Sequence, residues 1–335
     1  MTYPFLAIIA MVLLDPDTYI YIGYGILAFL SLVGLLVVWR SRRRWLRWTV
    51  SVVLVVLWVA HLYGAYVGPC QLKVRQVELT FDDLPPAFDG YKIVQFSDVH
   101  AGTMTGNRQR LLERAVDSIN AQQADMVVFT GDMQNVLPSE ITPLRELLSG
   151  IQAKDGVYSV MGNHDYPMYV NVPYEVKEEY LHLRKKEDRE MGWNLLVNTR
   201  RYIHRGNDSI VIAGMDNDGD GKRFPQLGNV SRTLFGVSRD EFVVMLEHDP
   251  TAWRRKILPQ CHAQLTLSGH THGGQVTLFG WSAADFAYTE SYGLYAIDSR
   301  YIYVNGGLGG VVPFRLGVTP EIVVITLKSN RQPIR

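Results

Sequence analysis

The sequence predicts an α/β domain that follows an N-terminal helical hairpin. Three observations support this prediction. Two uncharged segments of membrane-spanning length lie near the start, short apolar runs then alternate with helical patterns, and Asp, Asn and His residues follow five of those runs. The 335 residues are enough for one large catalytic domain in addition to the hairpin.

The hairpin is predicted from residues 19–39 and 49–68, which contain no Asp, Glu, Lys or Arg. Each segment is about 20 residues long, the length of a helix that crosses a bilayer. The connecting segment RSRRRWLRW is rich in arginine and tryptophan, which is typical of a short cytoplasmic loop and its interface. We therefore expect a multi-pass anchor over residues 1–69 in the cell membrane, with the rest of the chain on the outer, periplasmic or extracellular, side.

Residues 4–14 form a shorter apolar segment, closed by Asp15-Pro16-Asp17. It is too short to span a bilayer, so we expect an interfacial or re-entrant segment. The alternative interpretation of residues 19–68 is a pair of core helices. Two uncharged runs of this length, separated by five arginines, disfavour that alternative.

After residues 70–89, which we interpret as a linker and first strand, the pattern predicts a domain over residues 90–328. Apolar residues at helical spacing predict helices over 108–122, 139–148 and 173–191, with the charged run 185–190 as a solvated face. Short apolar runs predict strands at 91–97, 125–130, 156–161, 209–213, 242–246, 263–267, 275–279, 301–304 and 321–327. Alternation of this kind is typical of α/β folds, whose sites lie beyond the carboxyl ends of strands.

The composition excludes several classes of protein. The chain has 33 Lys and Arg against 33 Asp and Glu, so we expect no nucleic-acid binding through a basic face. Cys70 and Cys261 are the only cysteines, too few for a thiolate zinc site or a disulfide framework.

Potential metal ligands follow five predicted strands. The segments are DVH, GD, GNHD, EHDP and SGHTHGG. The seven residues that could coordinate a metal are Asp98, His100, Asp132, Asn163, His248, His270 and His272. Each segment alone is weak evidence, but their shared position at strand ends makes coincidence a poor explanation.

Nitrogen and oxygen donors without thiolate suit Mn, Fe or Zn. Seven ligands are too many for one tetrahedral zinc ion with an open position, and they suit two divalent ions that share a carboxylate. Such a pair positions a bridging hydroxide for in-line attack on a phosphoester. If residues 270–272 are extended, His270 and His272 point the same way and each serves a different ion.

The ordered motifs DVH, GDMQN, GNHD, EHDP and GHTH resemble the calcineurin-like metallophosphoesterases over roughly residues 90–328. The resemblance implies a four-layer α/β/β/α sandwich. It further implies one metal on Asp98, His100 and His272, a second on Asn163, His248 and His270, and Asp132 as the bridge. His164 would lie over the phosphate as the catalytic acid, a role common for histidine.

The C-terminal segments GLGG and PFR with PEI are similar to the YkuE/YaeI-like, membrane-associated branch. Arg315 in this segment is either a phosphate contact, which guanidinium groups suit, or a surface charge. The family pattern GDxxD departs here to GDMQN, with Asn135 in place of the final carboxylate. Asn135 would hold less positive charge on His164, and Asp165 is a candidate to orient that ring instead.

The run DNDGDG from Asp216 to Gly221 imitates the start of a calcium loop. Its twelfth position is Leu227 rather than the bidentate Glu that such loops require. We therefore interpret the run as a loop near the rim of the site, in which Asp216 either contacts substrate or supports a residue that does.

These observations predict a membrane-anchored, dinuclear phosphoesterase, and the anchor favours a lipid-linked or envelope phosphoester. One alternative is a pyrophosphatase for a nucleotide-linked lipid, which requires a cytoplasmic domain. Another is a non-catalytic membrane sensor that keeps the fold, which the full set of ligands disfavours.

Overall fold

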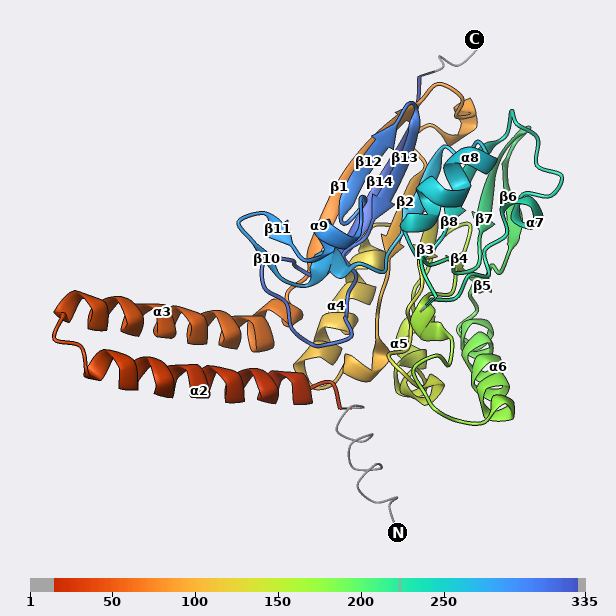
Figure 1. Cartoon of the computed structure of the whole chain (residues 1–335). Helices are drawn as coiled ribbons and strands as arrows, with labels where there is room; N and C mark the ends of the chain where they lie inside the picture. The colour runs from red at the N-terminus through yellow and green to blue at the C-terminus, as the bar shows by residue number, and fades with distance from the viewer. Residues whose placement is uncertain (1–14, 223, 331–335) are drawn as a thin grey trace.

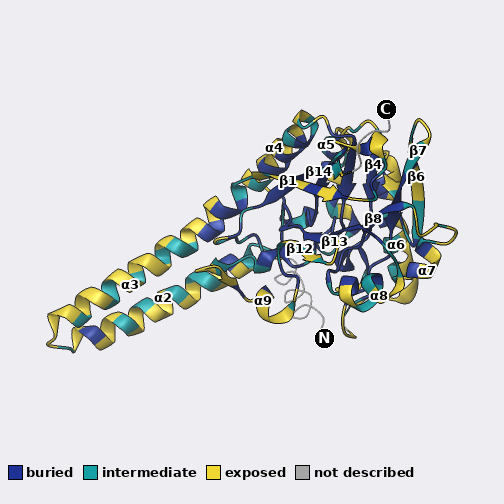
Figure 2. Cartoon of the chain, turned by 90° about the horizontal axis from the view of Figure 1, so that it is seen from above, coloured by how far each residue is buried: buried dark blue, intermediate teal, exposed yellow. Residues whose placement is uncertain are grey.

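The computed structural model describes residues 15–222 and 224–330, so the expected interfacial segment 4–14 lies outside the described residues. Two long helices, α2 (Thr18–Trp39) and α3 (Arg44–Leu62), lie side by side and extend away from the rest of the chain (Figure 1). The helical path of α3 continues through Tyr63–Cys70. Both helices are long and apolar enough to cross a membrane, and most of their large side chains are exposed (Figure 2).

The second helix begins earlier than the uncharged run, because Arg44 and Arg47 belong to its first turn. The Arg47 guanidinium donates to the carbonyl oxygens of Val38, Trp39 and Ser41. These carbonyls lie at the end of α2, where the helix itself supplies no donors. Arg47 therefore stabilises the loop end of the hairpin.

The other end of the hairpin is attached to the domain by several contacts. Arg108 pairs with Asp17 at 3.0 Å, just before α2. The carbonyl oxygen of Gly64, in the helical turn that follows α3, accepts the backbone N–H of Arg315 at 2.8 Å. The ring of Phe314 occupies the space a Cβ at Gly64 would need. The start of α2 and the end of α3 are thus both held against the domain.

The first sheet has six strands in the order β1-β14-β2-β3-β4-β5. It is parallel except where β14 meets β2. Its strands are β1 (Lys73–Phe81), β2 (Lys92–Phe96), β3 (Met126–Phe129), β4 (Val157–Ser159), β5 (Asn194–Leu195) and β14 (Glu321–Ser329).

The second sheet has the order β12-β13-β9-β8-β7-β6, with parallel pairing in its centre and antiparallel pairing at both edges. Its strands are β6 (Thr199–Arg205), β7 (Asp208–Gly214), β8 (Phe242–Leu246), β9 (Leu265–Ser268), β12 (Gly293–Ile297) and β13 (Arg300–Val304). A small separate hairpin joins β10 (Thr277–Leu278) to β11 (Trp281–Ser282), followed by the short helix α9 (Ala284–Ala287).

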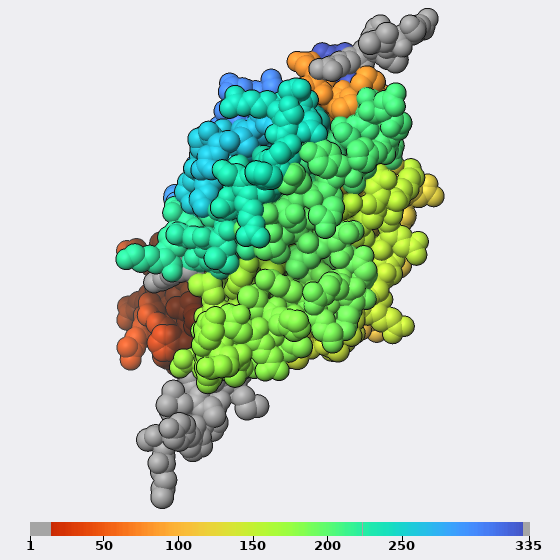
Figure 3. All heavy atoms as spheres, turned by 90° about the vertical axis from the view of Figure 1, so that its right-hand side faces the viewer, coloured from red at the N-terminus to blue at the C-terminus, as the bar shows by residue number. Residues whose placement is uncertain are grey.

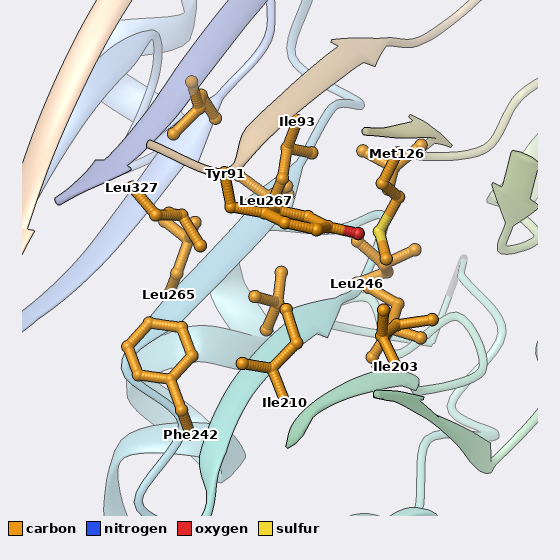
Figure 4. Close-up of a cluster of buried hydrophobic side chains, with 14 of the residues drawn as sticks. Tyr91, Ile93, Met126, Ile203, Ile210, Phe242, Leu246, Leu265, Leu267 and Leu327 are labelled. Carbon is orange, nitrogen blue, oxygen red and sulfur yellow. The ribbon is translucent and has the colours of Figure 1, made fainter. Parts of the chain in front are cut away.

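The two sheets pack face to face over a core of apolar side chains from both (Figure 4). A second apolar cluster lies between the first sheet and α4 (Asn107–Ala121) and α5 (Arg145–Ser149). A third lies between the second sheet and the helical turns α7 (Val230–Thr233), Trp253–Ile257 and α8 (Leu258–Gln260). This confirms the predicted four-layer α/β/β/α sandwich.

Two helix predictions need correction. The segment predicted as one helix over 139–148 forms two short 3₁₀ turns, Pro138–Glu140 and Thr142–Leu144, before α5. Pro138 and Pro143 each lack the N–H that a continuous helix would use.

In α6 (Tyr174–Glu190), the run 185–190 is not a uniformly solvated face, since Glu187 and Asp188 are buried. Each of these carboxylates forms an ion pair, Glu187 with Arg145 and Asp188 with Arg184. The helix lies at the end of the domain opposite α8 (Figure 1), and its yellow-green region is exposed on the face shown in Figure 3.

Candidate metal centre

The seven predicted ligands come together at the carboxyl ends of strands from both sheets. Asp98 and His100 follow β2, Asp132 follows β3 and Asn163 follows β4 in the first sheet. His248 follows β8, while His270 and His272 follow β9 in the second. Parallel strands end at the same edge, so the two sheets place their polar residues opposite each other. All seven are buried or nearly so.

Asp98, His100 and His272 form the first cluster, with one ligand atom of each within 4.8 Å of the others. The Nε2 atoms of His100 and His272 face each other at 3.2 Å, and His272 Nε2 lies 3.6 Å from Asp98 Oδ1. Burial lowers the pKa of His100 to about 3 and that of His272 well below its usual value. Neutral imidazole is the form that binds metals.

Asp132, His248 and His270 form the second cluster, again with one ligand atom of each within 4.8 Å. Asn163 joins it through Oδ1, which lies 2.8 Å from His270 Nδ1. His248 Nδ1 faces the Thr130 carbonyl oxygen at 2.7 Å and donates to it. This leaves His248 Nε2 directed at Asp132 Oδ2, 3.1 Å away.

Asp132 also connects the two clusters, because the same Oδ2 lies 3.7 Å from His100 Nε2. Burial opposes charge on both Asp132 and His248, but their mutual attraction prevails. The pKa of His248 is raised to about 10 and that of Asp132 lies well below its usual value. A positive charge beside Asp132 therefore stabilises its buried carboxylate, and a bound divalent ion would supply such a charge.

Five of the seven residues have left-handed backbone, namely Asp98, His100, Asp132, His270 and His272. Their φ angles lie between 47° and 74°. For residues other than glycine this region is sparsely populated and costs roughly 1–3 kcal/mol each. The surrounding structure therefore holds the ligands in strained positions, which is common where side chains must converge on one point.

The expectation that residues 270–272 are extended is therefore wrong. His270 and His272 are left-handed and Thr271 has helical angles, with φ −80° and ψ −20°. The two rings nevertheless reach different clusters. The turn that carries both rings begins at Gly269, which packs closely against Ser97 and Asp98. Only glycine fits there, because a Cβ would overlap the side chains of both residues.

His164 lies at the edge of the first cluster, with its ring 4.7 Å from that of His100. Its Nδ1 faces the backbone carbonyl oxygen of Asn135 at 2.6 Å and donates to it. The Asn135 side chain turns elsewhere, and its Oδ1 accepts from His100 Nδ1 at 3.1 Å. One residue thus orients both rings, through its backbone for His164 and its amide for His100.

Asp165 does not orient His164. Its carboxylate accepts the backbone N–H groups of Asp132, Met133 and Gly162 at 2.9–3.0 Å. It also pairs with the buried guanidinium of Arg184 at 2.6 Å. Asp165 therefore holds the loop that carries Asp132 against the loop that carries Asn163, a function that sequence spacing alone did not indicate.

Arg315 is neither a surface charge nor exposed to a phosphate, since only 2% of it is accessible. Its guanidinium donates to the carbonyl oxygens of His272, Gly307 and Gly309. Burial lowers the pKa of Arg315 to about 10. The residue secures the backbone beneath the first cluster.

Asp216 is also buried, and it accepts a hydrogen bond from the Tyr166 hydroxyl and the backbone N–H of Asn217. Burial raises the pKa of its carboxyl group. Its contacts are with the protein, so nothing in them indicates a substrate ligand.

Sequence reasoning missed two tyrosines that contact the site. The Tyr169 hydroxyl accepts from the Asn163 amide at 2.7 Å, and its ring stacks on His164 with centroids 4.3 Å apart. The Tyr288 hydroxyl lies 2.9 Å from His270 Nε2. Tyr169 lies four residues after the GNHD motif, and this position could have indicated that it is near the site. Tyr288 lies in a segment without any motif.

A four-layer sandwich with two adjoining Asp and His clusters at its strand ends is the architecture of a dinuclear metallohydrolase. The sequence profile of the calcineurin-like phosphoesterases matches residues 91–274, which is more than half of the chain. This protein belongs to that family and is a metal-dependent phosphoesterase.

Named relatives agree with this assignment. "Uncharacterized metallophosphoesterase YkuE" of Bacillus subtilis is 32% identical over 287 residues, covering 80% of this chain and 90% of the relative. An "Uncharacterized metallophosphoesterase" of Aquifex aeolicus is 29% identical over 283 residues, covering 82% and 99%.

A "Transmembrane protein with metallophosphoesterase domain" of Danio rerio is 30% identical over 284 residues, covering 82% of this chain. The chain spans only 62% of the length of that relative. Together with the two apolar helices, the similarity supports membrane association of this protein.

Proposed function

We propose that this protein is a membrane-anchored phosphoesterase that uses two divalent ions and acts outside the cytoplasmic membrane. The observation that carries this proposal is that Asp132, a member of the second cluster, also lies close to the first cluster. One carboxylate oxygen is within 3.7 Å of His100 Nε2 and 3.1 Å of His248 Nε2. A shared carboxylate of this kind is what a two-metal site requires.

The donor set supports a specific assignment. Asp98, His100 and His272 would hold one ion, and Asn163, His248 and His270 would hold the other. Asp132 would contribute to both sites. Nitrogen and oxygen ligands without sulfur favour Mn, Fe or Zn. When bound, the two ions supply an activated water and neutralise charge on the phosphate.

His164 acts as the catalytic acid in this proposal. Because its Nδ1 donates to the Asn135 carbonyl oxygen, its Nε2 is the atom free to hold the proton that goes to the leaving oxygen. The stacked ring of Tyr169 limits rotation of the imidazole. The contact is made by the backbone carbonyl oxygen of Asn135, while the Asn135 side chain contacts His100.

We divide the chain into a membrane anchor over residues 1–69, a linker and first strand over 70–89, and a catalytic domain over 90–328. The arginine-rich loop between α2 and α3 favours a cytoplasmic position. Both other ends of the two helices adjoin the domain, which then lies on the outer side. A multi-pass anchor of this kind holds the site close to the membrane surface.

The proposed side of the membrane can be tested with reporters. We expect alkaline phosphatase fused after Arg335 to be active in a bacterial host, and green fluorescent protein fused at the same position to remain dark. Replacing Arg40, Arg42, Arg43, Arg44 and Arg47 with glutamine should reduce this bias. A fluorescent, phosphatase-inactive fusion would contradict the outer orientation and favour hydrolysis of a nucleotide-linked lipid in the cytoplasm.

The enzymatic activity is tested with the full chain in detergent. We expect Mn²⁺ to support turnover of bis-p-nitrophenyl phosphate, p-nitrophenyl phosphate or both, and a chelator to abolish it. The two substrates also determine the preference for diesters or monoesters. Absence of turnover with Mn²⁺, Fe²⁺ and Zn²⁺ on both would favour a non-catalytic sensor.

A further inference from the structure

A large cavity connects the catalytic histidine to the start of the first membrane helix. Its volume is about 590 Å³, within the range of roughly 300–1,000 Å³ typical of small-molecule sites. The residues that line it are Pro16, Tyr19, Asn135, Val136, His164, Tyr169, Val170, Asn171, Val172 and Val311. These residues come from the hairpin, two active-site loops and the glycine-rich C-terminal segment.

The two ends of the cavity differ in character. Asn135, His164 and Tyr169 form the polar end beside the first metal cluster. The rest of the lining is mostly apolar, with Pro16 and Tyr19 at the start of α2, four valines and one further polar residue, Asn171. A ligand that fits both ends has a charged group at one end and an apolar chain at the other.

The apolar end lies where the protein meets the bilayer. Tyr19 is in the first turn of α2, and the ion pair between Arg108 and Asp17 holds that turn against the domain. The cavity therefore reaches the first turn of α2, the helix that we propose to cross the membrane. A chain of a membrane lipid can enter it without first leaving the bilayer for water.

A second surface feature indicates that this side of the domain rests on the membrane. Phe279 and Trp281 on the β10–β11 hairpin and Phe286 on α9 are all at least 67% exposed. In Figures 1 and 2 these elements lie on the side of the domain from which α2 and α3 extend. Exposed aromatic residues beside a membrane helix are typical of contact with the lipid interface.

We propose that the substrate is a membrane lipid phosphoester, with its phosphate at the metal centre and its apolar chain in the cavity. This inference rests on the proposed phosphoesterase function. In the reaction, the oxygen of water bonds to phosphorus as the bond from phosphorus to the leaving oxygen breaks. The leaving oxygen takes a proton from His164, and a proton from water then returns to His164. The products are a phosphate and an alcohol.

Binding of phosphonates, which are not hydrolysed, tests the inference without relying on turnover. Isothermal titration calorimetry would compare octylphosphonate with methylphosphonate on the full, Mn²⁺-loaded chain in one detergent. Each methylene removed from water contributes about a fourfold gain in affinity. We expect octylphosphonate to bind at least about 30-fold more tightly, even where part of its chain remains outside the cavity.

Two variants fill the cavity from different loops, Val172→Trp and Val311→Trp. We expect each to reduce the ratio of the two affinities to about threefold or less. Val74→Trp is the matched control, because Val74 on β1 is 38% exposed and Val311 is 37% exposed. Val74→Trp should leave both affinities unchanged. Partition of the phosphonates into detergent is the same for all variants, so it cancels when the affinity ratios of the variants are compared.

The possible outcomes separate the two proposals. Equal affinities for the two phosphonates in the unmodified protein would overturn the lipid inference and leave the phosphoesterase intact. So would an unchanged ratio in a tryptophan variant whose melting temperature shows that it is folded. If neither phosphonate binds the Mn²⁺-loaded chain, the proposed phosphoester site itself is contradicted.

Discussion

Replacing Asp132 with asparagine is expected to remove at least one of the two metals and to lower kcat/KM by about 1,000-fold or more, equivalent to about 4 kcal/mol. The amide keeps the size of the side chain and can still accept the backbone N–H of His164 at Oδ1, as the carboxylate does at 2.7 Å. It removes the negative charge at Oδ2, which faces His100 and His248. Metal analysis and activity on the same sample measure both effects.

Asp117→Asn, on the exposed face of α4, is the control for the loss of one carboxylate. It should retain both metals and full activity. The melting temperature of the metal-free Asp132→Asn protein shows whether the fold survives. If folded Asp132→Asn protein holds two metals per chain, the bridging role is incorrect.

Replacing His164 with alanine is expected to leave both metals bound and to lower kcat for an ester with an alkoxide leaving group by about 10²–10⁴-fold, the usual contribution of a general acid. His164 adjoins the first cluster, and its ring makes contacts with Asn135, Tyr169 and His100 rather than with the second cluster. Its loss therefore removes a proton donor and not a ligand. Metal stoichiometry and kcat measured together distinguish these two functions.

The leaving group provides a sharper test of the same residue. A p-nitrophenolate group departs without a proton, whereas an alkoxide does not, so the loss in His164→Ala should be much smaller for the p-nitrophenyl ester. His182→Ala, on the exposed face of α6, is the matched control and should change neither rate. An equal loss for both esters would contradict proton donation by His164, and loss of a metal would show that it is a ligand.

The anchor and the metal centre are structurally connected through one short segment. The backbone N–H of Arg315 donates to the carbonyl oxygen of Gly64, in the turn that follows α3. Its guanidinium donates to the carbonyl oxygen of His272. Gly307 in the same segment packs against Asp98 and His272. The hairpin is therefore part of the support of the first cluster, and studies of the catalytic centre are best done with the full chain.

Much of the centre could be predicted because its ligands lie in short motifs directly after apolar runs. Those runs are the central strands of two sheets, and strands with both faces covered require continuous apolar sequence. Asp98, Asn163 and His248 could be placed in this way before any contact was known. The strands β5, β6 and β12 were not predicted, since they are short or half-exposed and carry weaker patterns.

The roles of supporting residues could not be predicted in the same way. Asp165 was a candidate to orient His164, and Arg315 was either a phosphate contact or a surface charge. Both are buried and bind backbone groups of the ligand loops. Tyr288 had no sequence signal, although its hydroxyl contacts His270. Such roles depend on which loops become neighbours when the two sheets pack together.

The sequence by itself determined the chemical nature of this protein. Seven nitrogen and oxygen ligands at strand ends specify a dinuclear site, and two uncharged segments separated by arginines specify a hairpin of membrane-spanning length. Only the tertiary structure decided how the strained loops converge, which groups orient His164, and that a cavity runs from this histidine to the first turn of α2. The physical reason is that ligand chemistry is carried by individual residues, whereas strain, orientation and enclosed space arise only from contacts between distant segments.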